Sequence, residues 1–116
     1  MAAHLLRPVL AAALGAAVAT AAFAQPAETF LQKAIQGDTS EIMLGRLAVQ
    51  HGATPGVRRF GRTLVHDHSQ AKAEAAALAQ RLSIAAPTNP TDAAEQERLK
   101  LAGLSGRAFD REFVRY

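Results

Sequence analysis

Residues 54–82 read TPGVRRFGRTLVHDHSQAKAEAAALAQRL, and this stretch decides the fold. Thr54 is a typical helix cap, and Pro55 fits the first helical position, where its missing N–H costs nothing. Beyond them the apolar residues advance by steps of three, four and seven, the spacing of one helical face: Val57, Leu64, Ala71, Ala75, Leu78 and Leu82. The stretch therefore predicts one long amphipathic helix.

The middle of this helix carries Asp67-His68-Ser69. His68 comes four residues after Leu64 and three before Ala71, so it occupies the missing step of the apolar stripe. A titratable ring at such a position is either a ligand or a structural residue, hydrogen-bonded to Glu41 or to a backbone carbonyl. His66 lies about 160° away on the helical wheel, so the two histidines cannot chelate one ion.

The remaining sequence also predicts helices, and no period-two alternation indicates a strand. A first helical region runs from Ala27 to His51, with Asp38-Thr39-Ser40-Glu41 in the pattern of a capping box. It is either two helices or one long helix with a local irregularity. Two prolines exclude helix from the loop at residues 85–90. The fold class is therefore all-α.

Two shorter helices complete the expected bundle. The third begins at Thr91-Asp92, with Glu95 in capping-box spacing from Asp92, and ends near Ala102-Gly103. Ser105 is expected to cap the fourth, whose apolar stripe is aromatic: Phe109, Phe113 and Tyr116.

The fourth helix is much shorter than the second. Helices of a four-helix bundle match in length, because a short one leaves apolar surface of its partners exposed. We therefore expect either that the chain is a C-terminally truncated form of a longer bundle, or that self-association completes the bundle by swapping or dimerisation.

The N-terminus has the pattern of an export signal. A short basic segment, residues 1–7, precedes an apolar run over residues 9–23, and Ala22-Phe23-Ala24 is the small-x-small pattern of a signal peptidase site. Residues 1–24 are thus predicted to be a cleaved signal peptide, and residues 25–116 one small helical domain. The chain has no Cys, so its stability comes from packing alone. Without Arg7 the charge is near +2, which is too weak to indicate nucleic-acid binding.

Several spaced motifs together resemble one known family. These are Phe30-Leu31-Gln32-Lys33-Ala34, Leu44-Gly45-Arg46-Leu47-Ala48, Val57-Arg58-Arg59-Phe60-Gly61, Asp67-His68-Ser69 and Leu104-Ser105-Gly106-Arg107-Ala108-Phe109-Asp110. The chain is similar to the exported bacterial family catalogued as domain of unknown function 4142. The resemblance implies a ferritin-like antiparallel helical bundle in the periplasm, with outer-membrane association in some members. The family's fourth helix continues to a second Asp-His pair, which this sequence lacks.

A metal site is one functional hypothesis. Ferritin-like sites gather carboxylates and imidazoles inside the bundle. If the first turn is centred near Ala53, then Glu41 and His68 differ in height by roughly 4–5 Å, so Glu41, Asp67 and His68 can converge. Iron, manganese or zinc would suit these ligands. A dinuclear iron site is not expected, because position 65, where Glu-x-x-His needs a glutamate, is Val. Glu41 alternatively closes the capping box or pairs with Arg62.

No nucleophile–base pair or phosphate-binding loop stands out in the sequence. The first functional hypothesis is therefore a non-enzymatic periplasmic bundle with a binding or structural role at the cell envelope, including peripheral envelope contact. The metal-binding protein described above is the second. The third is a remnant of a longer family member, without a function of its own.

Overall fold

The computed structural model describes residues 13–116, and it describes residues 13–25 as helical backbone only. The elements are α1 (Ala13–His51), α2 (Pro55–Arg81), α3 (Asp92–Ala102) and α4 (Gly106–Arg115), and residues 13–116 contain no strand. The predicted all-α class is confirmed. The first half of the predicted signal peptide, residues 1–12, lies outside the described residues. Within the described part of the chain, no helix combines the length and apolarity needed to cross a bilayer.

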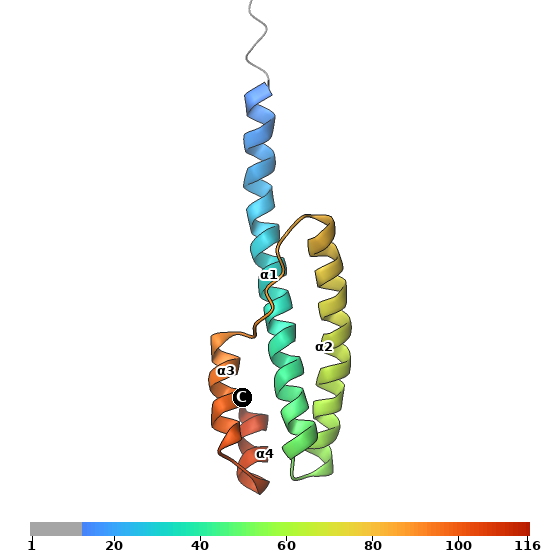
Figure 1. The fold of residues 1–116 in the computed structure, drawn as a ribbon, viewed down its shortest axis with the longest axis vertical. Helices are drawn as coiled ribbons and strands as arrows, with labels where there is room; N and C mark the ends of the chain where they lie inside the picture. The colour runs from blue at the N-terminus through green and yellow to red at the C-terminus, as the bar shows by residue number, and fades with distance from the viewer. Residues whose placement is uncertain (1–12) are drawn as a thin grey trace, which may run out of the picture.

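Helices α1 and α2 form a long antiparallel hairpin (Figure 1). Their backbones come closest where Gly45 faces Gly61. A Cβ atom built on Gly61 would lie 2.6 Å from the carbonyl oxygen of Gly45, and one built on Gly45 would lie 2.9 Å from that of Gly61. Glycine at both positions therefore permits a helix contact that a side chain would push apart.

Helix α1 is continuous, so the capping box predicted at residues 38–41 is wrong. The hydroxyl of Thr39 donates to the carbonyl of Ile35 at 2.7 Å, and that of Ser40 donates to the carbonyl of Gln36 at 2.8 Å. Hydroxyls bonded to the preceding turn continue a helix instead of starting one. Asp38 and Glu41 are consequently residues of a helix interior.

The other predicted helix starts are largely confirmed. The hydroxyl of Thr54 accepts a hydrogen bond from the N–H of Val57 at 3.3 Å, and that of Thr91 accepts from Ala94 at 3.1 Å. Two details are wrong. Ser105 occupies the cap position of α4 without a capping hydrogen bond from its side chain. Glu95 pairs with Arg98 at 2.6 Å, one turn further along the helix.

The segment between α2 and α3 follows α1 back toward the hairpin turn (Figure 1). Three α1 side chains at intervals of four residues hold it there. Gln32 donates to the carbonyl of Ala85 at 3.1 Å and Gln36 to that of Pro90 at 3.2 Å. The hydroxyl of Ser40 accepts from the N–H of Thr91 at 2.9 Å. One polar face of α1 thus sets where α3 begins.

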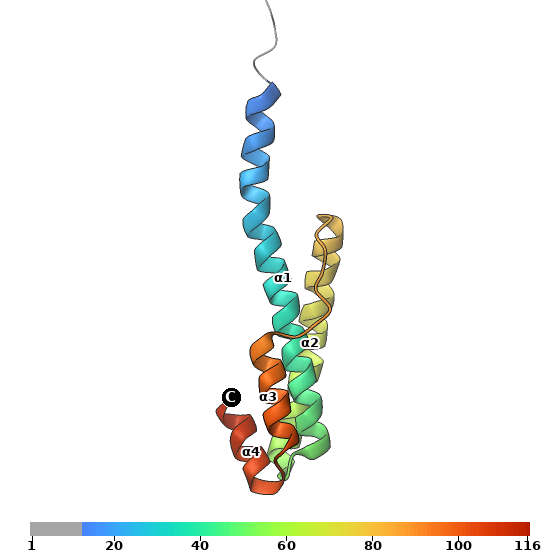
Figure 2. The ribbon, with the colours of Figure 1, turned by 60° about the vertical axis from the view of Figure 1, so that its left-hand side comes forward.

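Helices α3 and α4 cover only the half of α1 nearest the hairpin turn, as Figures 1 and 2 both show. The main core lies there, built by Leu44, Ala48, Val57, Ala94, Leu101, Phe109 and Phe113. Leu31, Ile35 and Ala79 form a smaller cluster at the far end of the hairpin. The predicted apolar stripes are therefore only partly buried: Tyr116 is 56% exposed and Leu82 is 51% exposed, because no helix covers them.

Candidate functional site

The predicted site residue His68 lies between α2 and α1 and is bonded to Asp38. Its Nδ1 atom lies 2.8 Å from Oδ1 of Asp38, and the two side chains are 32% and 14% exposed. The ring therefore has a polar partner, as the structural interpretation required. The predicted partners, Glu41 or a backbone carbonyl, are wrong, because the continuous α1 turns Asp38 toward α2.

The other two predicted ligands point elsewhere. Asp67 is exposed, and its Oδ1 lies 3.0 Å from Nδ1 of His66. Glu41 lines a hollow together with Leu64 of α2 and with Phe113 and Tyr116 of the C-terminal segment. It forms no ion pair with Arg62. No three side chains of His, Cys, Asp or Glu within the described residues are grouped closely enough to hold a metal ion.

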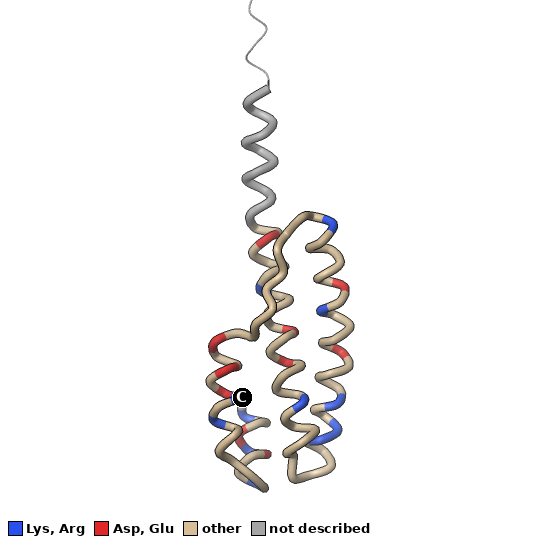
Figure 3. Tube along the Cα trace, viewed as in Figure 1, with Lys and Arg blue, Asp and Glu red and all other residues tan. Residues whose placement is uncertain are grey.

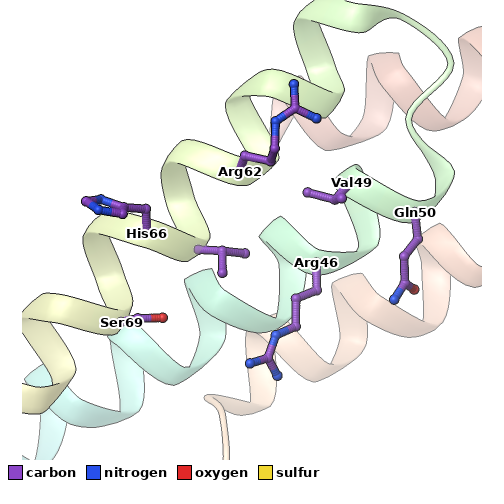
Figure 4. A pocket seen from close by; sticks show the side chains of 7 residues that line it. Arg46, Val49, Gln50, Arg62, His66 and Ser69 are labelled. Atoms are coloured by element: carbon purple, nitrogen blue, oxygen red, sulfur yellow. The ribbon is translucent and has the colours of Figure 1, made fainter.

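A different feature is a groove along α1. Its first part, a hollow of about 470 Å³, lies between α1 and α2 (Figure 4) and is lined by Arg46, Val49, Gln50, Arg62, Val65, His66 and Ser69. Its second part, about 490 Å³, extends toward α3 and is lined by Thr39, Ile42, Met43, Arg46, Leu47, Gln50, Lys72, Pro90 and Arg98. Because Arg46 and Gln50 line both parts, we treat them together as the α1 groove.

The charged residues that line the α1 groove are all basic, namely Arg46, Arg62, Lys72 and Arg98, and the imidazole of His66 lies beside them. Figure 3 shows arginines and lysines along the whole hairpin, several of them near its turn. Arg98 is already paired with Glu95, which raises the pKa of the Arg98 guanidinium. Within the described side chains, Arg46 and Arg62 form no ion pair. The groove therefore offers two free guanidinium groups to an anion.

The hairpin turn next to this groove is held by Asp110 of α4. Its carboxylate accepts hydrogen bonds from the N–H groups of Ala53 and Thr54 and from the Thr54 hydroxyl, at 2.8–2.9 Å. Partial desolvation raises the pKa of Asp110, but these three hydrogen bonds outweigh it and keep the pKa below its ordinary value. From the other side, Arg58 donates to the carbonyls of Gly52 and Ala53, each at 2.9 Å.

A second cluster of charges joins α3 to α4. Glu112 lies 2.6 Å from both Lys100 and Arg115, and hydrogen bonds from these two cations lower its pKa to about 2. Glu97 is 7% exposed, and its Oε1 atom has no hydrogen-bond partner. Burial, and then the neighbouring Glu112, raise the pKa of Glu97. This cluster holds α3 against α4, and none of its residues lines the α1 groove.

Sequence reasoning missed the α1 groove and Asp110. One signal for the groove was available, because Arg58, Arg59 and Arg62 stand out as a basic run. Only Arg62 of these three lines the groove, whereas Arg46 is contributed by α1 and Arg98 by α3. Asp110 lies inside a motif that carries the family resemblance, but its spacing in the sequence does not show which backbone it caps.

Comparison with known proteins agrees with the fold but adds no activity. No curated protein and no solved structure shows a significant match to the chain. One family model does match, over residues 12–116, and its description is Domain of unknown function (DUF4142). Since that match covers nearly the whole chain, including all four helices, the chain belongs to the DUF4142 family.

Proposed function

We propose that this protein is an exported, non-enzymatic helical bundle of the bacterial periplasm, which acts by binding a molecule on its α1–α2 hairpin. The observation that carries the proposal is the α1 groove, whose floor is apolar and whose charged lining is entirely basic. Sites that bind small molecules combine an apolar lining with a few polar groups in this way.

The arrangement of the titratable groups favours binding over catalysis. The groove contains a single imidazole, that of His66, and no carboxylate lines the groove beside it. Asp67, the acidic partner of His66, is exposed and does not line the groove. Arginines that hold an anion over an apolar surface position a ligand without transferring a proton.

Export is tested by fusing residues 1–24 to a reporter enzyme that folds only outside the cytoplasm. We expect reporter activity, together with a mature N-terminus at Gln25 when the native chain is sequenced after cell fractionation. Replacing Ala22 and Ala24 with bulky residues blocks processing if the predicted cleavage site is used. A chain found entirely in the cytoplasm with Met1 intact would refute the proposal.

Metal binding is a second candidate function, and the Asp38–His68 contact is the observation that favours it. Metal-binding histidines commonly hold their second ring nitrogen against a carboxylate, as His68 does through Nδ1. The Nε2 atom would then be the ligand, with Asp67 and Glu41 joining after side-chain rearrangement. Elemental analysis for iron, manganese and zinc after metal-supplemented expression tests this candidate. Equal metal content in the wild type and His68→Ala would rule out His68 as a ligand and would refute this candidate function.

A further inference from the structure

The α1 groove has a floor of apolar side chains that water reaches. Val49 and Val65 form the floor of the first hollow and are half-buried, while Met43 and Leu47 play the same part in the second. Both hollows are open: the first is lined by residues of α1 and α2 alone, and α3 contributes only Arg98 to the lining of the second. Figure 2 shows that α3 and α4 lie beside only part of α1. A ligand that covers this apolar surface is favoured, because it removes the surface from water.

The basic residues stand on both walls above this floor. Arg62 and His66 come from α2, whereas Arg46 and Gln50 come from α1, and Val49 points between the two walls (Figure 4). Guanidinium groups bind carboxylate or phosphate with two parallel hydrogen bonds. This attraction is stronger beside an apolar surface, because less water screens the charges. The groove thus combines an anion-binding rim with an apolar floor.

The shape of the groove decides between two kinds of occupant. From Thr39 to Gln50 it follows α1 for roughly 16 Å, at about 1.5 Å per residue. Arg46 and Gln50 divide it into two hollows. An amphipathic helix from a partner protein needs a continuous apolar stripe to dock, which this division interrupts. A flexible chain can pass beside the Arg46 stem, and its charged end can meet the guanidinium.

We propose that the α1 groove binds a single-chain anionic amphiphile, with its carboxylate or phosphate group held by the guanidinium of Arg46 or Arg62 at the rim and its alkyl chain over Val49 and Val65. This inference rests on the proposed binding function and names its ligand class. The acyl chain supplies the apolar contact, and the charged group selects this groove over the uncharged apolar surface at the far end of the hairpin.

Isothermal titration of the full chain with dodecanoate, below the concentration at which it forms micelles, tests the proposal. We expect a Kd in the micromolar range, dodecyl phosphate within about threefold of it, and binding at least about tenfold weaker for uncharged dodecyl maltoside. Acetate, which has the charge without the chain, should not bind measurably. Equal affinity for dodecanoate and dodecyl maltoside would overturn the proposal.

Charge reversal locates the site. Arg46→Glu combined with Arg62→Glu should weaken dodecanoate binding at least about tenfold. The matched control is Arg107→Glu with Arg111→Glu, which changes the net charge equally at exposed α4 positions outside the groove and should leave the Kd within about twofold. Far-UV circular dichroism and the unfolding temperature establish that both variants fold. An equal loss in both pairs would show non-specific attraction and overturn the site.

Two substitutions of apolar residues test the site if the charge-reversal variant does not fold. Val65→Gln should weaken binding, whereas Leu78→Gln, on the exposed far end of α2, should not. Binding to phosphatidylglycerol vesicles without binding of monomeric dodecanoate would replace the proposal with a membrane-surface role. Normal export with no binding of any amphiphile overturns this inference alone, whereas a failure of export with intact dodecanoate binding overturns only the proposed location.

Discussion

Asp110 accepts two hydrogen bonds from Thr54, one from its backbone N–H at 2.9 Å and one from its hydroxyl at 2.8 Å. A third comes from the N–H of Ala53 at 2.8 Å. A carboxylate of α4 thereby satisfies backbone donors that precede α2, near the positive end of that helix. The contact ties the last helix of the chain to the turn between the first two.

Replacing this carboxylate should loosen the C-terminal half of the bundle. Hydrogen bonds to charged groups contribute about 1.5–3 kcal/mol when shielded, and Asp110 is half-exposed, so we expect Asp110→Ala to lower the free energy of unfolding by about 1–2 kcal/mol. Urea unfolding followed by circular dichroism measures it. Asp67→Ala, which removes an exposed carboxylate, is the control and should change stability by less than about 0.5 kcal/mol. Equal effects would contradict a specific role for Asp110.

Acid should destabilise the protein through Glu112 and Asp110. Both have a lower pKa in the folded chain than their ordinary values of 4.5 and 3.8, that of Glu112 being about 2. Their stabilisation is complete above those ordinary values and is lost as the pH falls through the folded ones. Unfolding temperature should therefore decline between about pH 4.5 and pH 2. Glu112→Gln should flatten this decline, and an unchanged profile in that variant would contradict the assignment.

Glu97 should act in the opposite direction. Because burial raises its pKa, the folded chain holds the proton that the unfolded chain releases, so the protein loses stability as the pH rises from 4.5 through the folded pKa. Glu97→Gln keeps the shape without the titration. We expect it to raise stability at pH 7 by about 1 kcal/mol, since the amide can donate to Glu112, and to have little effect at pH 4. Destabilisation at pH 7 would show that the ionised carboxylate is needed.

The contact between Gly45 and Gly61 makes a steric prediction. Gly61→Ala places a methyl group against the carbonyl of Gly45 and the side chain of Ala48, so the helices must separate. Overpacking of this kind costs about 1–3 kcal/mol. Gly37→Ala is the control, because nothing lies within 4 Å of its added Cβ and alanine favours helix, so stability should rise by up to about 1 kcal/mol. Opposite signs for the two variants, measured by thermal unfolding, support the close crossing.

The sequence predicts those parts of the fold that depend on neighbouring residues. Thr54 and Thr91 cap helices through groups three residues away, so the starts of α2 and α3 follow from local pattern. The α1 groove could not be predicted in this way, because its lining comes from α1, α2 and α3 and its basic residues are exposed, where no periodicity marks them. Asp110 was missed for the same reason, since its partners lie more than fifty residues earlier.

The wrong prediction of the hydrogen-bond partner of His68 has a more specific cause. The capping pattern at residues 38–41 predicts that Asp38 caps a helix instead of facing α2, which leaves Glu41 as the carboxylate level with His68. With α1 continuous, Asp38 and His68 lie equally far along the chain from Ala53, and so at matching heights on an antiparallel hairpin. The height argument was sound, but the local capping pattern assigned it to the wrong carboxylate.

The Asp38–His68 contact should therefore couple the two helices energetically. In a double-mutant cycle, Asp38→Asn removes the carboxylate and His68→Gln removes the imidazole, first singly and then together. Since the His68 side chain is about one-third exposed, we expect a coupling energy of about 0.5–1 kcal/mol, measured by urea unfolding. The His66–Asp67 pair, with both side chains mostly exposed, is the control and should show coupling near zero. Coupling near zero in the Asp38–His68 cycle as well would mean that this contact does not help to hold the hairpin together.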